Sequence, residues 1–573
     1  MHEVLGSARD ALNPRRRALA LRAMREEVFD IAVVGGGVTG AGVALDAATR
    51  GASVALLEAG DLASGTSSRS GKVFHGGLRY LGQLEFSLVR KAAHERNLMI
   101  ERLCPHLARP TPFLYPLVRP GLDRLVMGTG LFLYDLLGGR APRDMPRHRH
   151  LGREATLREA PGLKPDGLRG GLVFYDAIVD DARHTLAVAR TASRYGAQIA
   201  TRVEVIGMLR DGRAVAGVEA CDLETGERLR VRARCVVNAA GAWADLVQRL
   251  AGEASLEVRP AKGIHLVVPR ASIASSAALI TRTADSVLVA RPWRRFWIIG
   301  TTDTPWNHDR SDPAANASDV DYLLLQANRW LRTPLRREDV VGVYAGVRPL
   351  LGGKGLATAA MSREHAVLEG PPRFITVTGG KYTTYRLMAR DAVDAAARSL
   401  GREAAPSVSA QTPLVGAERW AAMLNQRARL AREAGIPEEA IAHLLARHGS
   451  LTEEVLDLAK ERSELARPLE GALDYLEAEI VYAATHEGAL HLDDVLARRT
   501  HVAMETLDRG LVAAPRAATL MAEVLGWETK RREEELLRYR LMVEADRLSE
   551  QQATDSEAVA ARRDHAARSS VES

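Results

Sequence analysis

The chain has 573 residues, 46% of them hydrophobic and 26% charged, with a formal net charge of +6 and a pI near 9.2. This composition excludes a chain that is disordered throughout, and the length predicts several globular domains. Three cysteines without C-x-x-C spacing exclude a disulfide framework and give no support to a cysteine-based metal site.

The positive charge allows three kinds of partner: an anionic substrate, an anionic membrane surface or nucleic acid. Residues 1–28 are rich in arginine but lack the apolar core and cleavage site of a secretory signal, so we expect a solvated helical extension. A run of about 18 apolar residues is absent, and the sequence therefore predicts no membrane-spanning helix.

The clearest pattern lies in residues 29–58, which read as strand, glycine turn, helix and strand. Gly35 permits the tight turn, Gly37 lets a pyrophosphate approach the helix N-terminus, and Gly40 allows close packing of helix on strand. Glu58 ends the second strand, where an acid accepts hydrogen bonds from a ribose. We interpret the stretch as an ADP-binding site; the alternative is a glycine turn in another parallel sheet.

Residues 61–81 are dense in hydroxyl side chains and glycines and show neither helical nor strand periodicity. They also carry Lys72, His75, Arg79 and Tyr80, so the segment offers many donors along an extended ligand. Because the segment directly follows the ribose-binding acid, we interpret it as a binding loop; the alternative is a mobile surface loop.

The glycine turn, residues 66–68 and residues 75–81 resemble the FAD-dependent glycerol-3-phosphate dehydrogenases, the quinone-reducing branch of the D-amino-acid-oxidase-like flavoproteins. The resemblance covers about residues 29–545 and implies an α/β fold: a Rossmann-like FAD-binding domain interleaved with an antiparallel-sheet substrate domain, plus an all-α C-terminal domain. One departure is Gly71, where the family pattern has a serine. The resemblance assigns cofactor contacts to Thr66, Ser67, Ser68, Lys72, His75, Gly76 and Gly77, and substrate contacts to Arg79 and Tyr80.

Residues 84–103 have the spacing of an amphipathic helix, and residues 122–137 form a strongly apolar stretch with arginines on both sides. Such a stretch suits a membrane interface, where arginines meet anionic lipid. The alternative is a buried helix with a basic exposed face. The resemblance implies a cytoplasmic enzyme attached peripherally to the cytoplasmic face of the membrane.

A second cofactor motif ends at Gly241, after residues 202–237, whose alternation predicts antiparallel strands. Its small residues would let the flavin nucleotide approach; packing alone is the alternative. Before these strands, Asp180 or Asp181 is expected to cap a helix N-terminus.

Four later motifs carry the chemistry that the resemblance implies. Residues 262–269 present His265, and residues 296–304 present Thr302 and Asp303. Thr302 is assigned to substrate binding, and Asp303 is expected either to orient a ligand or to brace a loop. Two further motifs present arginines, whose guanidinium forks bind phosphate and stay charged. These are Arg348 and Arg363.

Residues 374–386 predict a strand, a Gly379-Gly380 turn and a helix. A helix N-terminus aimed at the flavin would stabilise negative charge on the reduced ring, and Lys381 would reach the substrate from the same turn. The alternative is another phosphate-binding turn.

Beyond about residue 401 the composition changes to Ala, Leu, Glu and Arg at helical spacing. We expect helices near 417–434, 438–447, 451–460, 475–486, 492–508 and 515–545. Ser450 and Glu453 predict a capping box for the third. The predicted divisions are an N-terminal extension (1–28), the interleaved FAD and substrate domains (29–400), a helical domain (401–548) and a disordered tail (549–573).

The function implied is FAD-dependent oxidation of sn-glycerol 3-phosphate to dihydroxyacetone phosphate, with non-covalent FAD, a membrane quinone as acceptor and a homodimer as one possible assembly. Arg348, helped by Arg363 or Arg79, would hold the phosphate, and His265 and Lys381 are the candidates for proton transfer. We expect no metal ion.

Two alternatives stay open at this point. The first is an oxidase that reduces oxygen, although the extra substrate-domain insertion of such oxidases is not seen in the chain. The second is a non-catalytic, FAD-containing scaffold or nucleic-acid-binding protein. Aromatic residues make up 5% of the chain and are not interleaved with basic clusters, so we expect no nucleic acid as partner.

Overall fold

The structure is a computed structural model. It describes residues 10–118, 121–140, 142, 145–283, 287–352 and 364–572, except for the side chains of Arg79, Leu122 and residues 567–572. Within these ranges, no helix is both long and apolar enough to cross a bilayer.

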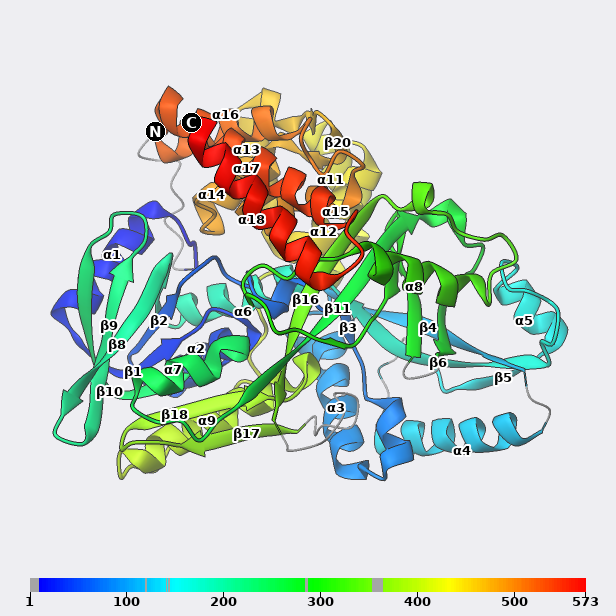
Figure 1. The fold of residues 1–573 in the computed structure, drawn as a ribbon, viewed down its shortest axis with the longest axis horizontal. Helices are drawn as coiled ribbons and strands as arrows, with labels where there is room; N and C mark the ends of the chain where they lie inside the picture. The colour runs from blue at the N-terminus through cyan, green and yellow to red at the C-terminus, as the bar shows by residue number, and fades with distance from the viewer. Residues whose placement is uncertain are drawn as a thin grey trace.

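The first sheet has a parallel centre, in the strand order β17-β18-β10-β1-β2-β7 (Figure 1). Helices α2, α6 and α9 cover one face, and α1 packs on the other side with buried Leu21 and Met24. The predicted extension is therefore a docked helix, since its apolar residues lie in a core. The bounds are α1 Pro14–Glu26, β1 Val28–Val34, α2 Val38–Thr49, β2 Val54–Glu58, α6 Asp181–Arg194, β7 Gln198–Thr201, β8 Val203–Asp211, β9 Ala214–Asp222, β10 Arg228–Asn238, α7 Ala244–Leu250, β17 His365–Glu369, β18 Phe374–Gly379 and α9 Tyr385–Ser399.

The second sheet is mostly antiparallel, in the order β15-β11-β14-β13-β12-β4-β6-β3, with β16 paired to β11 and β5 to β6. The chain passes from the first sheet to the second and back twice, which is the interleaving that the sequence predicts. The bounds are β3 Val73–Phe74, α3 Phe86–Leu98, β4 Ala108–Leu117, α4 Leu122–Leu137, β5 Arg149–Gly152, α5 Arg153–Glu159, β6 Gly170–Val179, β11 Val258–Pro269, β12 Ala278–Arg282, β13 Val287–Trp293, β14 Phe296–Gly300, β15 Thr304–Pro305, α8 Ala317–Asn328 and β16 Gly342–Leu351.

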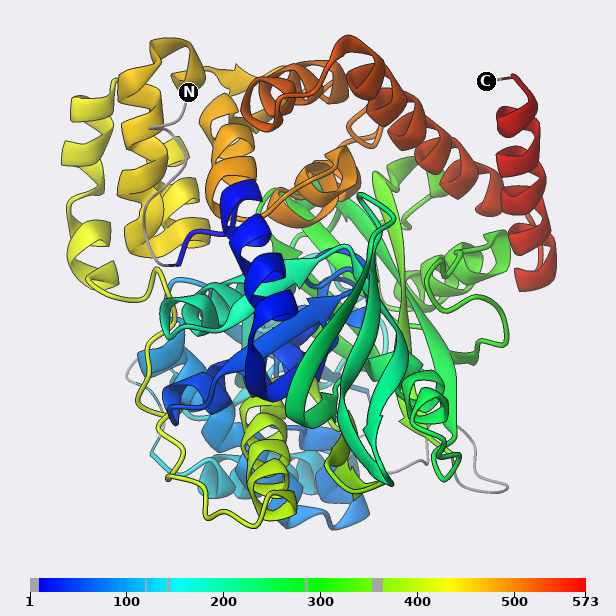
Figure 2. The same ribbon diagram turned by 90° about the vertical axis from the view of Figure 1, so that its left-hand side faces the viewer.

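A third, helical part with its own core lies on top of both sheets (Figure 2). Its predicted helices are found, but several of them are divided. The helix predicted at 417–434 is split into α10 and α11, and the one predicted at 492–508 is a π-helix followed by the short α15. The prediction of a capping box at Ser450 and Glu453 is wrong, because α13 has Leu451 as its N-cap and no side-chain cap. The last predicted helix is broken at Gly526, whose φ of +69° ends α16. The bounds are α10 Trp420–Asn425, α11 Arg427–Ala434, α12 Glu438–His448, α13 Thr452–Glu461, β19 Pro468–Leu469, β20 Ala472–Leu476, α14 Glu477–His486, a π-helix Asp494–Arg499, α15 Val502–Glu505, α16 Ala514–Leu525 and α17 Thr529–Ser549.

The predicted disordered tail is wrong, because residues Asp555–Glu572 form helix α18. The segment lacks apolar periodicity, but it needs only Ala558 and Val559 to fill a small apolar contact with the body of the protein. Ion pairs from Asp555 and Arg562 complete the docking. The sequence pattern missed the helix because charge pairing with distant residues replaces a continuous apolar face.

Candidate active site

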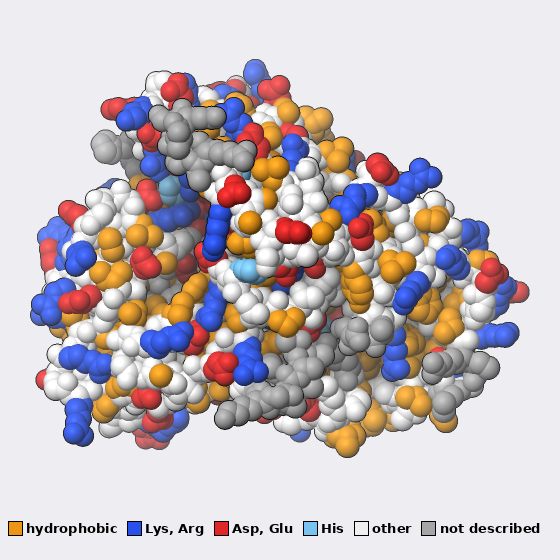
Figure 3. All heavy atoms as spheres, in the orientation of Figure 1, with side chains coloured by type: hydrophobic (Ala, Val, Ile, Leu, Met, Phe, Trp, Pro, Cys, Tyr) orange, Lys and Arg blue, Asp and Glu red, His pale blue; other side chains and the backbone are white. Residues whose placement is uncertain are grey.

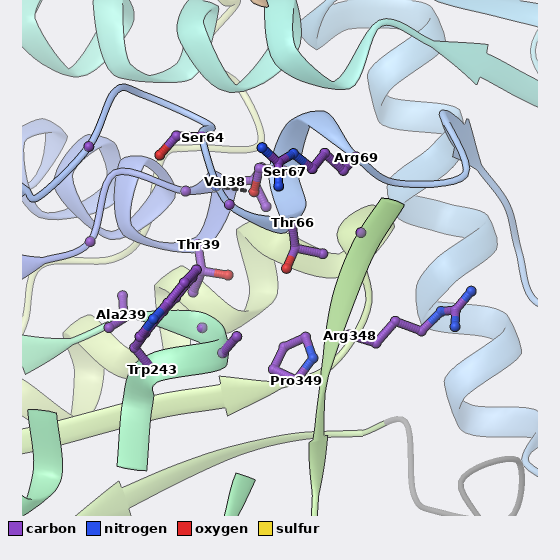
Figure 4. Close-up of a pocket in the computed structure, with 18 of the residues that line it drawn as sticks. Val38, Thr39, Ser64, Thr66, Ser67, Arg69, Ala239, Trp243, Arg348 and Pro349 are labelled. Atoms are coloured by element: carbon purple, nitrogen blue, oxygen red, sulfur yellow. Dashed lines mark hydrogen bonds between the residues drawn. The ribbon is translucent and has the colours of Figure 1, made fainter. Parts of the chain in front are cut away.

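A cavity of about 1080 Å³ runs between the two sheets. One end lies at the carboxyl ends of β1, β2, β10 and β18, where ligands of parallel sheets bind. The other end reaches β11 and β16 of the second sheet. Figure 4 shows Val38 and Ser67 on one side of this space, and Trp243 and Ala239 across it from Arg348. Its volume exceeds the range of about 300–1,000 Å³ for drug-sized ligands, so it has room for a dinucleotide.

The nucleotide end is shaped by glycines. A Cβ on Gly40 would lie 1.9 Å from the carbonyl oxygen of Gly35, and Gly35 itself has a φ of +110°. Gly37 is the N-cap of α2 and has no side chain to fill the space before the helix. The Ser67 hydroxyl substitutes for a cap by accepting from the Val38 N–H at 2.9 Å. This is a cradle that only a bare backbone leaves open for a phosphate.

The Glu58 carboxylate borders the same end and accepts from the backbone N–H of Gly36 at 2.5 Å and of Gly60 at 2.7 Å. Burial raises the pKa of Glu58, and these two hydrogen bonds oppose the rise. Each oxygen keeps a second lone pair, so the carboxylate braces the turn and can still accept from a ribose hydroxyl.

Not every predicted cofactor residue lies at the cavity. The Lys72 ammonium is buried, 2.5 Å from Asp181 and 3.0 Å from the carbonyl oxygen of Ser68. Burial alone would lower the pKa of Lys72, but the Asp181 carboxylate outweighs burial and raises it. These contacts fix the binding loop to α6, and Lys72 does not line the cavity, so its predicted flavin contact stays a prediction. Asp180 caps α6, as predicted for one of the two acids.

The remaining loop residues divide in the same way. Thr66, Ser67, His75 and Tyr80 line the cavity, as does Gly241 after β10. Three of these loop residues do not line it, namely Ser68, Gly76 and Gly77, and neither does Gly40 of the glycine turn. The Arg79 side chain and Arg363 lie outside the described part of the structure, so their predicted roles stay predictions.

The substrate end brings together side chains from distant parts of the chain. His265 of β11, Arg348 of β16 and Lys381 after β18 all line it, together with Gly379 and Gly380. The Lys381 Nζ lies 3.5 Å from the centre of the Tyr80 ring. His265, Arg348 and Lys381 are the residues that the sequence predicts as catalytic.

The Arg348 guanidinium is held by one loop. It donates to the Thr301 hydroxyl at 2.9 Å, to Asp303 at 3.0 Å and to the carbonyl oxygen of Thr302 at 3.1 Å. The Thr302 hydroxyl accepts from the Ile264 N–H at 3.0 Å and is buried. Thr302 therefore fixes the loop to β11 and does not line the cavity, so its predicted substrate contact stays a prediction. Asp303 is the brace that was one of its two expected roles.

His265 is buried and stacks on Tyr344 at 4.7 Å between ring centres. Burial lowers the pKa of His265 well below its usual value, and the charges of Arg291, Arg348 and Lys72 lower it further. Among the described residues its Nδ1 has no hydrogen-bond partner. Burial and the neighbouring cations therefore favour the neutral imidazole, and the residue borders the cavity with one buried nitrogen unpartnered.

The sequence did not single out several residues that border the cavity. Trp243 stands two residues after Gly241, and Arg69 stands within the binding loop, so nearness to a motif was their only signal. Asp493 and Arg498 come from the helical domain and had no local signal. Arg498 donates to Asp61 at 2.6 Å, which ties that domain to the loop after Glu58. In the described part of the chain, no His, Cys, Asp and Glu side chains cluster as a metal site would require.

Comparisons with known proteins agree with this geometry. The family model of FAD dependent oxidoreductases matches residues 30–395, and the C-terminal domain of alpha-glycerophosphate oxidase matches residues 407–532. A glycerol-3-phosphate dehydrogenase of Mycobacterium leprae (strain TN) is 48% identical over 546 residues, which are 95% of this chain and 93% of the relative. The mitochondrial glycerol-3-phosphate dehydrogenase of Homo sapiens is 35% identical and aligns with 91% of this chain and 74% of its own length.

Solved structures show the same architecture. A glycerol-3-phosphate dehydrogenase from Bacillus halodurans complexed with FAD superposes with a TM-score of 0.77 at 28% identity, over 93% of this chain and 98% of that one. An L-alpha-glycerophosphate oxidase from Mycoplasma pneumoniae with FAD bound has a TM-score of 0.54 at 19% identity, over 68% of this chain and 99% of that one, and shares the fold.

The shape and lining of the cavity also fit FAD. The glycine cradle at the α2 N-terminus suits a pyrophosphate, and the cavity extends from Glu58 to His265 of the second sheet. The predicted fold class and cofactor are confirmed. The chain belongs to the FAD-dependent glycerol-3-phosphate dehydrogenases, within the FAD-dependent oxidoreductase family.

Proposed function

We propose that the protein oxidises sn-glycerol 3-phosphate to dihydroxyacetone phosphate and passes the electrons to a membrane quinone. The relatives, which are glycerol-3-phosphate dehydrogenases by name, support the substrate. The observation that carries the proposal is that Arg348, His265 and Lys381 line the same cavity that also carries the dinucleotide cradle.

Arg348 is suited to hold the substrate phosphate. Its guanidinium is already oriented by the loop that holds Thr301 and Asp303, so little side-chain entropy is lost when an anion binds. Fixing the phosphate fixes the carbinol carbon two bonds further along the substrate. FAD, held by the glycine cradle, Glu58 and Ser67, supplies the acceptor for the hydride from that carbon.

His265 is suited to take the hydroxyl proton, so that the alcohol loses a proton and a hydride and becomes a ketone. The imidazole is neutral and can accept, but neighbouring cations make it a weak base. A phosphate bound at Arg348 would cancel part of that positive charge and raise the pKa of His265. Basicity would therefore increase when substrate binds. Lys381 is the second candidate, as an ammonium group that stabilises the developing alkoxide.

Helix α4 supports attachment to a membrane surface. Leu131 and Tyr134 face the core, whereas Leu125, Phe132 and Leu136 on the same helix are 68%, 59% and 65% exposed. Leu84, on the turn before α3, is 73% exposed. Figure 3 shows hydrophobic side chains along this lower edge of the molecule. An outward apolar face favours the interfacial helix over the buried helix that was the alternative.

Anaerobic reduction tests the substrate. The purified yellow enzyme should lose its flavin absorbance on addition of sn-glycerol 3-phosphate and keep it with glycerol or with the sn-1 phosphate. If unphosphorylated glycerol bleaches the flavin equally well, the role given to Arg348 is wrong. If no phosphorylated polyol bleaches it and the protein instead retards RNA in a gel, the scaffold alternative takes its place.

The electron acceptor needs a separate measurement. The substrate-reduced enzyme should be reoxidised quickly by a short-chain quinone and slowly by dissolved oxygen, with little hydrogen peroxide formed. Rapid reoxidation by oxygen with one peroxide per turnover would favour the oxidase.

A flotation assay tests the membrane surface. The enzyme should float with vesicles that contain anionic lipid, and the double variant Leu125→Glu with Phe132→Glu should stay at the bottom. Leu473→Glu is the matched control, because Leu473 is 75% exposed but lies in the helical domain. Equal loss of flotation in the control would remove the special role of α4.

A further inference from the structure

The C-terminal helix lies against the outer side of the substrate end. The stretch from residue 550 to Arg562, which we call the C-terminal clasp, comprises the linker after α17 and the first half of α18. Figure 1 shows α18 crossing the molecule with its beginning close to β11 and β16. None of the active-site motifs lies in the clasp or next to it in sequence. The proposed function assigns the clasp no role.

The linker is hydrogen-bonded to the beginning of α8. Ala317 N–H donates to the carbonyl oxygen of Gln552 at 2.7 Å, and the Ser318 hydroxyl donates to that of Ala553 at 2.7 Å. Asn316, the N-cap of α8, donates to Asp555 at 2.6 Å. The beginning of α18 is thus anchored by several directed bonds as well as by packing.

At the centre of this contact is Lys262 of β11, which is 1% exposed. Its ammonium pairs with Asp555 and with Asp319 and donates to the carbonyl oxygen of Ala314 at 3.3 Å. A buried ammonium needs this full set of partners, because an unpaired buried charge is costly. Asp555 therefore supplies, from the clasp, one of two negative charges that hold Lys262.

Lys262 is next to the residues that form the substrate end. Its register partners are Val347 of β16 and Thr304 of β15, so it lies beside both Arg348 and the loop that holds Arg348. Gly263, the following residue, lines the cavity.

The apolar part of the clasp reaches the same wall. Ala558 and Val559 pack in one cluster with Trp306, Val347 and Ala242. Ala242 lines the cavity from inside, and Trp306 begins the segment directly after the Arg348 loop. On the far side of the cluster, Arg562 bridges Asp312 and Asp546.

We propose that the C-terminal clasp is a positioning element for Arg348, acting through the Asp555–Lys262 ion pair and the Trp306 cluster. This rests on the proposed role of Arg348 as the phosphate ligand. The contacts form an unbroken series from Asp555 to Lys262, from Lys262 to β15, and from the loop before β15 to the guanidinium. Loosening the clasp should weaken substrate binding and leave the chemical step unchanged.

The test compares Asp555→Asn with Asp564→Asn in the full-length, FAD-loaded enzyme. Asparagine keeps the acceptor for Asn316 and removes only the charge facing Lys262; Asp564 is exposed on the same helix and is the matched control. The KM for sn-glycerol 3-phosphate should rise about threefold to tenfold in Asp555→Asn, the range seen for changes along a coupling network. The kcat should stay within about twofold, Asp555→Glu should restore KM, and Asp564→Asn should match wild type.

The second variant is a chain that ends at residue 552. Its KM for sn-glycerol 3-phosphate should rise at least as much as that of Asp555→Asn. The proposal is overturned if KM in Asp555→Asn equals that of wild type, or if kcat falls as much as kcat/KM. Hydrogen exchange tests the clasp independently of the proposed function. If wild type does not oxidise the substrate, faster exchange of residues 300–306 in Asp555→Asn still supports the clasp, and unchanged exchange overturns it.

Discussion

The two ends of the cavity are built from different kinds of atoms. At the nucleotide end, Gly35, Gly37 and Gly40 present backbone, and the decisive feature is the absence of side chains. At the substrate end, Arg348, His265 and Lys381 come from three separate strands or turns and present charge or an imidazole. The first end is specified by one continuous stretch of sequence, whereas the second exists only when the two sheets pack together.

This contrast explains how each end is held. The nucleotide cradle is stiffened by local backbone geometry and by the Glu58 carboxylate on the N–H groups of Gly36 and Gly60. The substrate end is stiffened by side chains that hold other side chains, as in the three bonds on Arg348. Substitutions that disturb the first end should therefore weaken cofactor binding, and those at the second should affect substrate kinetics with the cofactor in place.

The largest effect is expected for Gly40→Ala. The new Cβ would overlap the carbonyl oxygen of Gly35 at 1.9 Å, so the turn must shift away from the position that receives the pyrophosphate. Overpacking of this kind costs about 3 kcal/mol, which corresponds to FAD binding about a hundredfold weaker. Flavin fluorescence titration of the apoenzyme measures it.

Gly71→Ser is the matched control for that variant. Gly71 also lines the cavity, but a Cβ there has no atom within 4 Å. Its FAD affinity should equal or exceed that of wild type. Normal FAD content in Gly40→Ala would show that the cradle is not set by backbone packing.

The second prediction concerns Arg348→Lys and Arg348→Met, which should both retain FAD. Loss of a charge-assisted, oriented pair costs about 3 kcal/mol, so kcat/KM should fall about a hundredfold in both. Lysine should not rescue, because a point charge cannot bond Thr301 and Asp303 while it also binds a phosphate fork. Steady-state kinetics with a dye acceptor measure the change.

Arg259→Met controls for loss of an arginine from the same pair of strands. Arg259 lies on β11 but is exposed and pairs with Glu257 at the surface, so kcat/KM should change by less than about twofold. A full rescue by Arg348→Lys would mean that charge, and not the orientation of the guanidinium, is what the substrate end supplies.

The contrast between a local and a dispersed site also explains which features could be predicted from the sequence. The strand, turn and helix of residues 28–58 were predictable because the pattern and its structural cause lie within one stretch. Asp180 was predictable as a helix cap for the same reason. The substrate residues were found through their motifs, but sequence gave no measure of which would meet.

What the sequence missed depends on partners far along the chain. Lys72 pairs with a carboxylate 109 residues away, and that pairing removes it from the cavity. Helix α18 is stable because Asp555 meets Lys262 and Arg562 meets Asp312, neither of which leaves a local periodicity. Arg498 reaches the loop after Glu58 from another domain. A charged residue in sequence does not show whether its partner is water, a ligand or a distant acid.

The smallest expected effect is a change of stability with pH at His184. His184 of α6 is buried behind the turn that carries Lys381 and bonds the Tyr382 hydroxyl at 2.9 Å. Burial lowers the pKa of His184 to about 3, against a small opposing effect of Asp180. Below about pH 6.5 the unfolded chain binds a proton at this residue and the folded chain does not, so the free energy of unfolding falls as the pH falls.

His184→Gln keeps a polar group for Tyr382 and removes the titration. Between pH 7 and pH 5.5, wild type should lose about 1.4 kcal/mol more stability than the variant, since one proton over about one pH unit is worth that amount. His106 and His486, with pKa values lowered to about 3 and about 4, act in the same direction but are present in both proteins and cancel in the difference. Urea unfolding at the two pH values measures it, and parallel losses in the two proteins would show that His184 accepts a proton in the folded state. In that case the turn at Lys381 would carry an extra positive charge in mild acid, and the substrate end, unlike the nucleotide end, would change its charge within the working pH range.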